Sequence, residues 1–206
     1  MDHGKGSLDD AARIRAVVFD MDGTITRPCL DFDAIRAELG IEAGQPLLEA
    51  MERMTPDDRA AAEKVVQRCE AAAADASELQ DGAADTLRAL RARGIRVGLL
   101  TRNSRRSVET VLQKHGLTFD FIRTREDGAF KPSAEPVLAV CRALEVPPER
   151  VLTVGDYLFD LQAGAAAGTR TALMIGDRET PAFAGLADYV IRSLREVLDI
   201  IERETL

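Results

Sequence analysis

The sequence predicts an α/β protein with a doubly wound parallel sheet and a small, all-helical inserted domain. Short apolar runs alternate with helical patterns over most of the chain, which is typical of a parallel sheet with helices on both faces. One stretch, residues 27–80, contains helical patterns alone. The chain has 206 residues, 46% apolar and 30% charged, a globular composition with room for one domain and a smaller insertion.

The expected strands are short runs in which apolar residues follow one another almost without interruption. Strands of a parallel sheet are covered on both faces, so they lack the alternation of apolar and polar residues seen in half-exposed strands. Flanking glycines and helical patterns set their limits. The expected strands are residues 16–19, 97–100, 121–122, 151–154 and 171–174, with 189–191 as a last short one.

Between these strands, apolar residues recur at intervals of three and four, as on a helix with one buried face. Val108, Val111 and Leu112 form one such stripe, and Gly116 is expected to end that helix. Ser193 and Glu196 have the spacing of a capping box before the last helix. The other stripes are Val137, Val140, Cys141 and Leu144, and then Leu194, Val197, Leu198 and Ile201.

Residues 27–80 are expected to form a helical cap domain inserted after the first strand, with residues 1–26 and 81–206 forming the α/β core. One cap helix is predicted to begin at Thr55 and Pro56, because threonine is a favoured N-cap and proline fits the first turn. The other cap stripes are Phe32, Ile35 and Leu39, and Leu47, Met51 and Met54.

Charge and cysteine content limit the expected partners. The formal charge is −8, from 35 acidic and 27 basic residues, so neither nucleic acid nor an anionic membrane is an expected partner. No apolar run approaches the roughly 20 residues of a membrane span, and the first dozen residues show no signal-peptide pattern. Three widely spaced cysteines, Cys29, Cys69 and Cys141, favour reduced thiols. We therefore expect a cytoplasmic protein.

Polar residues follow each of the first four expected strands. In open parallel sheets, ligands bind beyond the carboxyl ends of the strands, so these residues are expected at one edge. Four carboxylates, a hydroxyl and an ammonium group would then lie together. In chain order, the residues are Asp20, Asp22, Gly23 and Thr24, then Thr101, Arg102 and Asn103, then Lys131, and finally Asp156 and Asp160.

Such a cluster of carboxylates is reasonable around a divalent cation. Two unit charges about 4 Å apart repel by roughly 4 kcal/mol at a surface-like dielectric. Oxygen ligands with room for phosphate and water suit Mg²⁺. Lys131 and Thr101 offer a charge and a hydroxyl to phosphoryl oxygens, and backbone N–H groups near Gly23 and Asn103 offer further donors. The pattern therefore predicts a magnesium-dependent site for a small phosphate ester.

The order of these motifs resembles the haloacid dehalogenase (HAD) superfamily, in its phosphatase branch with a helical cap. DMDGT comes first, then a strand ending at Thr101, then Lys131-Pro132, and then GDYLFD. The likeness extends from Arg15 onward, and the helical insertion lies where that superfamily often carries a cap. Four motifs in this order are specific, whereas DxD alone would be weak. Phosphoglycolate phosphatases are the members that it resembles.

The resemblance implies a role for each residue. Asp20 would be the nucleophile that forms an aspartyl-phosphate, and Asp22 the general acid and then the general base. The carboxylates of Asp20 and Asp156, with the backbone carbonyl of Asp22, would hold Mg²⁺. Thr101 and Lys131 would bind the transferring phosphoryl oxygens.

Other residues are assigned supporting roles. Asp160 would orient Lys131 or a metal-bound water. The candidates for further contact with substrate phosphate are Gly23, Thr24, Arg102 and Asn103. In the cap, a second anionic group, as in a phosphoglycolate-like acid, would meet one of Arg27, Arg36 and Arg53.

Three competing functions are weighed by whether they need Asp22 and by where the phosphate acceptor lies in the chain. A dehalogenase has no leaving oxygen to protonate and would not need it. A sugar-phosphate mutase uses both leading aspartates and stays open as an alternative. A non-enzymatic receiver-like module would also accept phosphate on an aspartate, but its acceptor follows the third strand and it has no helical insertion. Whether the protein is a monomer or a homodimer stays open.

Overall fold

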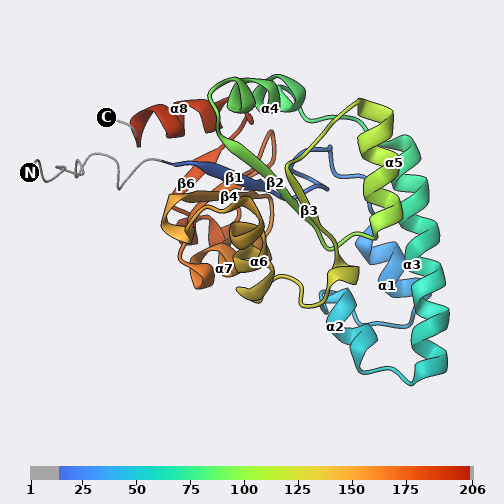
Figure 1. Ribbon diagram of the computed structural model, residues 1–206. Coiled ribbons are helices and arrows are strands. Elements are labelled where there is room, and N and C mark those ends of the chain that lie inside the picture. The colour runs from blue at the N-terminus through green and yellow to red at the C-terminus, as the bar shows by residue number, and fades with distance from the viewer. Residues whose placement is uncertain (1–13, 205–206) are drawn as a thin grey trace, which may run out of the picture.

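The structure is a computed structural model that describes residues 14–204 (Figure 1). The predictions for the first dozen residues, that they hold no signal peptide and begin the core, lie outside the described range. None of the helices within residues 14–204 is long and apolar enough to cross a membrane.

A six-stranded parallel sheet forms the centre of the protein, with the strand order β3-β2-β1-β4-β5-β6. The chain runs outward from β1 to β3, then returns to the other side of β1 and runs outward again. The point at which the order reverses therefore lies between β1 and β4, where ligands bind in open α/β sheets. The strands are β1 (Ala16–Phe19), β2 (Arg96–Leu100), β3 (Phe121–Arg123), β4 (Val151–Gly155), β5 (Arg170–Met174) and β6 (Tyr189–Ile191).

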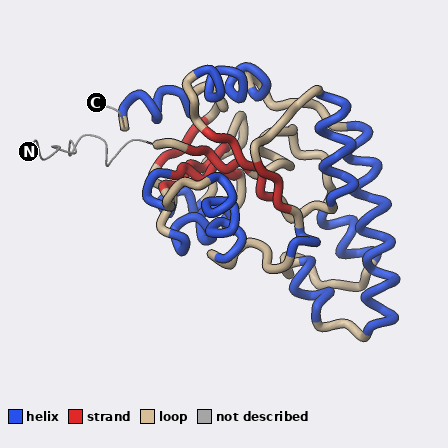
Figure 2. Tube along the Cα trace, viewed as in Figure 1, coloured by secondary structure: helices blue, strands red, loops and turns tan. Residues whose placement is uncertain are grey.

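Helices cover both faces of this sheet, which confirms the predicted fold class (Figures 1 and 2). On one face, residues of α4 (Ala83–Ala92), α5 (Arg105–His115) and α8 (Glu196–Arg203) share a core with strand residues such as Val17 and Leu99. On the other face, α6 (Glu135–Leu144) and α7 (Leu158–Ala167) pack over the sheet. All six predicted strands are present, within one residue at each end.

Helix ends follow the predicted signals at two of three places. Thr55 caps α3 (Pro56–Ala76) by accepting a hydrogen bond from the Asp58 N–H at 3.3 Å. Gly116 ends α5 with a φ of 63°. The capping box before α8 forms only in part. The Glu196 carboxylate accepts from the Ser193 N–H at 2.9 Å, but the helix begins at Glu196 itself, so the Ser193 hydroxyl does not cap it.

Three helices, α1 (Phe32–Glu38), α2 (Leu47–Glu52) and α3, lie between β1 and α4, and no strand does within residues 27–80. They enclose a small core of their own that includes Ile35, Met51 and Val66. Figure 1 shows them at one side of the sheet, with α3 alongside α5. The division of the chain into a cap and a core domain stays a prediction.

The two connections to this helical stretch run side by side. Thr26 and Leu79 form an antiparallel bridge, the Arg27 N–H donates to the Glu78 carbonyl at 2.8 Å, and the Gln80 N–H donates to the Ile25 carbonyl at 2.9 Å. The chain therefore leaves and re-enters the core at one place, directly after the turn that follows β1.

Candidate active site

Asp20 lies at the carboxyl end of β1, in the middle of the sheet. Its N–H donates to the Val154 carbonyl of β4 at 2.9 Å, which fixes its backbone beside the neighbouring strand. Its side chain is buried. The apolar run before it forms the central strand, so the fold itself places this carboxylate at the reversal of strand order.

The Lys131 ammonium group holds Asp20 in place. Its Nζ donates to Asp20 Oδ1 at 2.5 Å, to Asp160 Oδ1 at 2.5 Å and to the Leu100 carbonyl at 3.0 Å. All three donors of the ammonium group are therefore used. Burial by itself would lower the pKa of Lys131, but Asp160 and Asp20 outweigh it, and the pKa is raised. The lysine is consequently a fixed positive charge.

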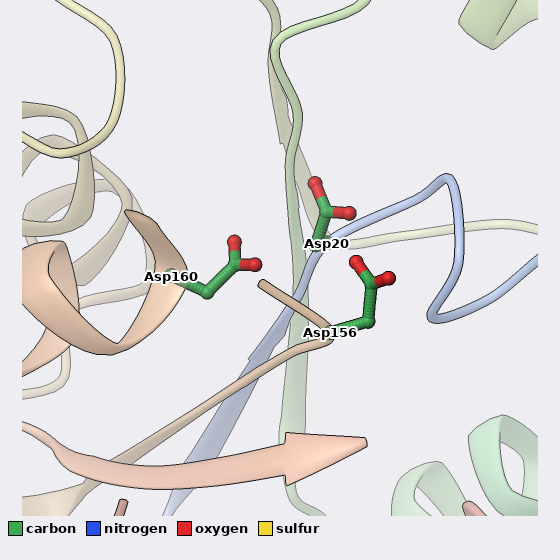
Figure 3. Close-up of side chains that lie close together, drawn as sticks. All are labelled: Asp20, Asp156 and Asp160. Atoms are coloured by element: carbon green, nitrogen blue, oxygen red, sulfur yellow. The ribbon is translucent and has the colours of Figure 1, made fainter. Parts of the chain in front are cut away.

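Asp20, Asp156 and Asp160 bring three carboxylates together (Figure 3). One oxygen of each lies within 4.8 Å of the others, only slightly more than the roughly 4 Å between opposite ligands of one Mg²⁺. Burial raises the pKa of Asp20, Lys131 opposes this, and the other two carboxylates add to it. Burial raises the pKa of Asp156 to about 7, with Asp160 adding and Arg178 opposing. The negative charge of the three carboxylates is thus only partly neutralised by Lys131 and Arg178, which is typical of a site that binds a cation.

Asp160 differs from the other two because both of its oxygens already accept hydrogen bonds. Oδ1 accepts from Lys131, and Oδ2 accepts from the Tyr157 N–H at 3.1 Å, in the first turn of α7. Asp20 and Asp156 are therefore better candidates than Asp160 for ligands of a hard cation, which prefers oxygen atoms that are free to coordinate it. This arrangement is compatible with Asp160 acting on Lys131, as the sequence predicts.

Two glycines allow the aspartates to approach so closely. A Cβ at Gly23 would lie 2.2 Å from Asp156 Oδ2, and the φ of Gly23 is +85°, a region that other residues rarely adopt. A Cβ at Gly155 would lie 2.0 Å from the Asp160 Cγ. The glycines next to the aspartates of both motifs are therefore required by the packing of the carboxylates.

Asp22 follows two residues after Asp20 and faces the helical stretch. Its Oδ1 accepts from the Cys29 N–H at 3.2 Å. Burial raises the pKa of Asp22 to about 6; the N–H groups of Cys29 and Leu30 oppose the shift, and the charge of Glu70 adds to it. A carboxyl group with a pKa of about 6 can both donate and accept a proton near neutral pH.

A cavity of about 360 Å³ lies between the sheet edge and the three inserted helices. Its floor includes the predicted residues Asp20, Asp22 and Lys131, and its opposite wall is mostly apolar, with Ile35 and Leu47 as examples. Pockets of this size accept small molecules, and a few polar groups within an apolar lining orient them.

Most of the predicted site residues line this cavity. They are Asp20, Asp22, Thr101, Arg102, Asn103, Lys131, Asp156 and Asp160. Gly23 and Thr24 are not among the lining residues, and Thr24 is fully buried. The Asn103 N–H donates to Thr101 Oγ1 at 3.1 Å, within their own turn. Phosphate binding by Gly23 and Thr24 therefore stays a prediction that the cavity lining does not favour.

Three charged residues of the site were missed. Arg178 donates to Asp156 Oδ2 at 2.9 Å and also lines the cavity. It follows β5, so inspecting the carboxyl end of that strand would have found it. Glu49 of α2 pairs with Arg102, and Glu70 of α3 accepts from the Ser104 N–H at 3.1 Å. Neither glutamate lies at a strand end, and the sequence pattern gave no signal for them.

Comparison with known proteins agrees with this geometry. A family model described as haloacid dehalogenase-like hydrolase matches residues 33–168. The chain belongs to this family. A haloacid dehalogenase-like hydrolase domain-containing protein of Arabidopsis thaliana is 30% identical over 92% of this chain and 84% of its own length. The predicted resemblance to this superfamily is thereby confirmed.

Two relatives of this hydrolase have names that state a phosphatase activity. An N-acetylmuramic acid 6-phosphate phosphatase of Pseudomonas aeruginosa is 29% identical, over 93% of this chain and 96% of its own length. A phosphoglycolate phosphatase of Chromobacterium violaceum is 28% identical, over 92% of this chain and 97% of its own length. This hydrolase is thus an enzyme of the phosphoric monoester hydrolase type.

Solved structures share the architecture of this hydrolase. A hydrolase from Pseudomonas syringae superimposes with a TM-score of 0.79 over 92% of this chain and 98% of its own, at 16% identity, which shows the fold alone. CbbY from Rhodobacter sphaeroides, solved in complex with phosphate, is 25% identical with a TM-score of 0.67, over 89% of this chain and 96% of its own.

Proposed function

We propose that this hydrolase is a magnesium-dependent phosphatase that cleaves a small phosphorylated metabolite through an aspartyl-phosphate on Asp20. The observation that carries the proposal is the hydrogen-bonded trio of Asp20, Lys131 and Asp160 on the floor of a cavity that Asp22 also lines. A carboxylate held by a charged donor is oriented for attack and cannot turn away from the substrate.

In the first step, a carboxylate oxygen of Asp20 attacks phosphorus and the bond from phosphorus to the ester oxygen breaks. Asp22 gives its proton to that leaving oxygen. In the second step, Asp22 takes a proton from water, whose oxygen attacks phosphorus, and the bond from phosphorus to Asp20 breaks. Free phosphate leaves and both aspartates are restored. The pKa of about 6 supports both roles of Asp22.

The cation would be held by the carboxylates of Asp20 and Asp156 and by the backbone carbonyl of Asp22. Mg²⁺ there would offset the negative charge of the phosphate and of the carboxylates around it. The Thr101 hydroxyl would bind a phosphoryl oxygen. Lys131, kept in position by Asp160, would attract the phosphoryl oxygens through its charge, because its three donors are already used.

Activity is expected to vanish in a chelator and to return when Mg²⁺ is added. Ca²⁺ should support it poorly, because its larger and looser coordination allows geometries unsuited to in-line attack. The measurement is phosphate release from an aryl phosphate after exhaustive chelation, with each metal added back. Undiminished turnover in the chelator would contradict the magnesium mechanism.

The cap side of the cavity supports a substrate that carries a second anionic group. Of the three arginines considered from the sequence, Arg36 alone lines the cavity. Its side chain is 16% exposed. Its Nη2 donates to Asp33 at 2.7 Å and its Nη1 to the Gln45 carbonyl at 3.4 Å, whereas its Nε is buried without a hydrogen-bond partner. Arg27 is 59% exposed beside Glu78, and Arg53 is exposed. Phosphoglycolate and N-acetylmuramic acid 6-phosphate, the substrates in the relatives' names, both pair a phosphate with a carboxylic acid.

Replacing Arg36 by Gln is expected to raise KM for phosphoglycolate about tenfold, as the loss of a charged hydrogen bond does, with kcat little changed. An aryl phosphate without a carboxylate should be unaffected. Arg53→Gln is the matched control, because it removes an exposed cap arginine outside the cavity. Equal KM values for the two variants would show that Arg36 does not bind the second group.

A further inference from the structure

Arg102 joins the helical cap to the backbone of the catalytic lysine. Its Nη1 and Nη2 donate to the two oxygens of Glu49, on α2, at 2.9 and 2.6 Å. The same Nη1 donates to the Lys131 carbonyl at 2.6 Å. One planar guanidinium group thus bonds to the cap and to the loop that carries Lys131.

Two aromatic rings fix the plane of this guanidinium group. The Arg102 Cζ lies 4.9 Å from the ring centre of Phe130 and 4.7 Å from that of Phe159. Phe130 immediately precedes Lys131, and Phe159 immediately precedes Asp160, which also bonds to Lys131. The side chains of Arg102 and Glu49 are 19% and 25% exposed, so water screens their pairing only in part.

We infer that Arg102 is a positioning residue whose pairing with Glu49 couples the position of α2 to the placement of Lys131. The inference rests on the proposed function and replaces direct phosphate contact as the role of Arg102. Three of the five guanidinium N–H groups of Arg102 donate hydrogen bonds, two to the carboxylate of Glu49 and one to the Lys131 carbonyl. Opening of α2 away from the core would release the bidentate partner and loosen the Lys131 loop.

Other contacts hold α3 against the core, so the Arg102–Glu49 pair is expected to affect the position of α2 and not that of α3. Glu70 of α3 pairs with Arg125 and with the Ser104 N–H, and the Lys114 ammonium group donates to the carbonyls of Asp75 and Ser77 at 2.5 and 2.8 Å. These contacts fasten α3 to α5 and to the segment after β3 that carries Arg125. Among the ion pairs of residues 14–204, the Arg102–Glu49 pair is the one that joins α2 to the core.

The test combines Glu49→Gln, Arg102→Lys and the double variant. Each single change should lower kcat/KM about tenfold, mainly through kcat, and the double variant should lose little more, because one coupled contact is removed in all three. Glu38→Gln is the matched control. The Glu38 carboxylate also pairs with an arginine, since Nη2 of Arg68 donates to its two oxygens at 2.7 and 2.6 Å, but both residues belong to the cap. Its kinetics should stay unchanged.

Phosphate inhibition separates positioning from substrate contact. If Arg102 only positions Lys131, the inhibition constant of inorganic phosphate should change by the same factor in Glu49→Gln and in Arg102→Lys. If Arg102 binds phosphate, Arg102→Lys should weaken inhibition while Glu49→Gln, which frees the guanidinium group, leaves it equal or tighter. That second result would overturn the inference, as would kinetics of Glu49→Gln equal to those of Glu38→Gln.

Hydrogen exchange separates this inference from the proposed function. In the protein without substrate, Glu49→Gln should raise amide exchange in residues 47–52 of α2 at least several-fold, and Glu38→Gln should not. A wild-type protein without phosphatase activity would refute the proposed function, but the amide exchange of α2 in Glu49→Gln could still be compared with that in Glu38→Gln. Unchanged exchange in an active enzyme would refute the coupling alone.

Discussion

Replacing Asp20 by Asn is expected to abolish turnover and to leave no phosphorylated protein. The amide is a far weaker nucleophile than the carboxylate. Besides Asp20, Lys131 binds one other carboxylate, that of Asp160, and its second oxygen already accepts a hydrogen bond from the Tyr157 N–H, so Asp160 is not expected to replace Asp20. Removing a covalent nucleophile costs on the order of 10⁶ in kcat. Phosphate release and intact-protein mass, measured after exposure to an aryl phosphate, test this.

The Asp20→Asn protein is expected to fold, so a loss of activity can be attributed to the missing nucleophile. The substitution removes one of three mutually repelling carboxylates, and Lys131 keeps its bond to Asp160. Circular dichroism and the melting temperature provide the check. Asp127→Asn is a matched control, because Asp127 pairs with Arg105 outside the cavity. Phosphoprotein in the Asp20→Asn sample would show that another residue is the nucleophile.

Much of this site could be predicted because its residues are tied to the periodic part of the sequence. The strand before Asp20 is a continuous apolar run, and so are those before Thr101 and Asp156. Parallel strands bring their carboxyl ends to one edge, so locating the strands also locates the side chains that follow them. The same reasoning would have reached Arg178, which lies four residues beyond β5.

Contacts between the helices of residues 27–80 and the rest of the protein could not be predicted in this way. Glu70 and Arg125 are 55 positions apart, and Glu49 and Arg102 are 53 apart. Charged residues on helices and loops are ordinarily solvated, so nothing in the local pattern marks these four as partners. Only the three-dimensional placement of α2 and α3 against the core brings each pair together.

The helical stretch is also less separate from the core than the sequence pattern suggests. Ala74 of α3 belongs to the buried cluster formed by the sheet and α4, α5 and α8. Glu70 is 3% exposed and neutralises Arg125 of the core. Replacing residues 27–80 by a linker would therefore expose one face of α5 and leave Arg125 without its buried partner, at a cost typical of breaking a buried ion pair, about 3–5 kcal/mol.

Replacing Asp22 by Asn is expected to separate the two chemical steps. With an aryl phosphate, whose phenolate leaves without a proton, Asp20 can still attack and the first step proceeds. The second step stalls, because no base is left to take a proton from water. General acid–base assistance is worth about 10²–10⁴ in rate, so the phosphorylated enzyme should accumulate as a burst.

The leaving group supplies the control for this variant. With an alkyl phosphate, departure itself needs the proton from Asp22, so the same Asp22→Asn protein should remain almost unmodified. Intact-protein mass measures both cases, and the aryl ester alone should add one phosphoryl unit per chain. Asp22 Oδ1 accepts a hydrogen bond from the Cys29 N–H, and the side-chain oxygen of Asn can accept the same bond. The turn after β1 should therefore keep its shape. Unimpaired turnover of the alkyl ester would mean that Asp22 is not the acid, and a dehalogenase-like use of Asp20 alone would then have to be reconsidered.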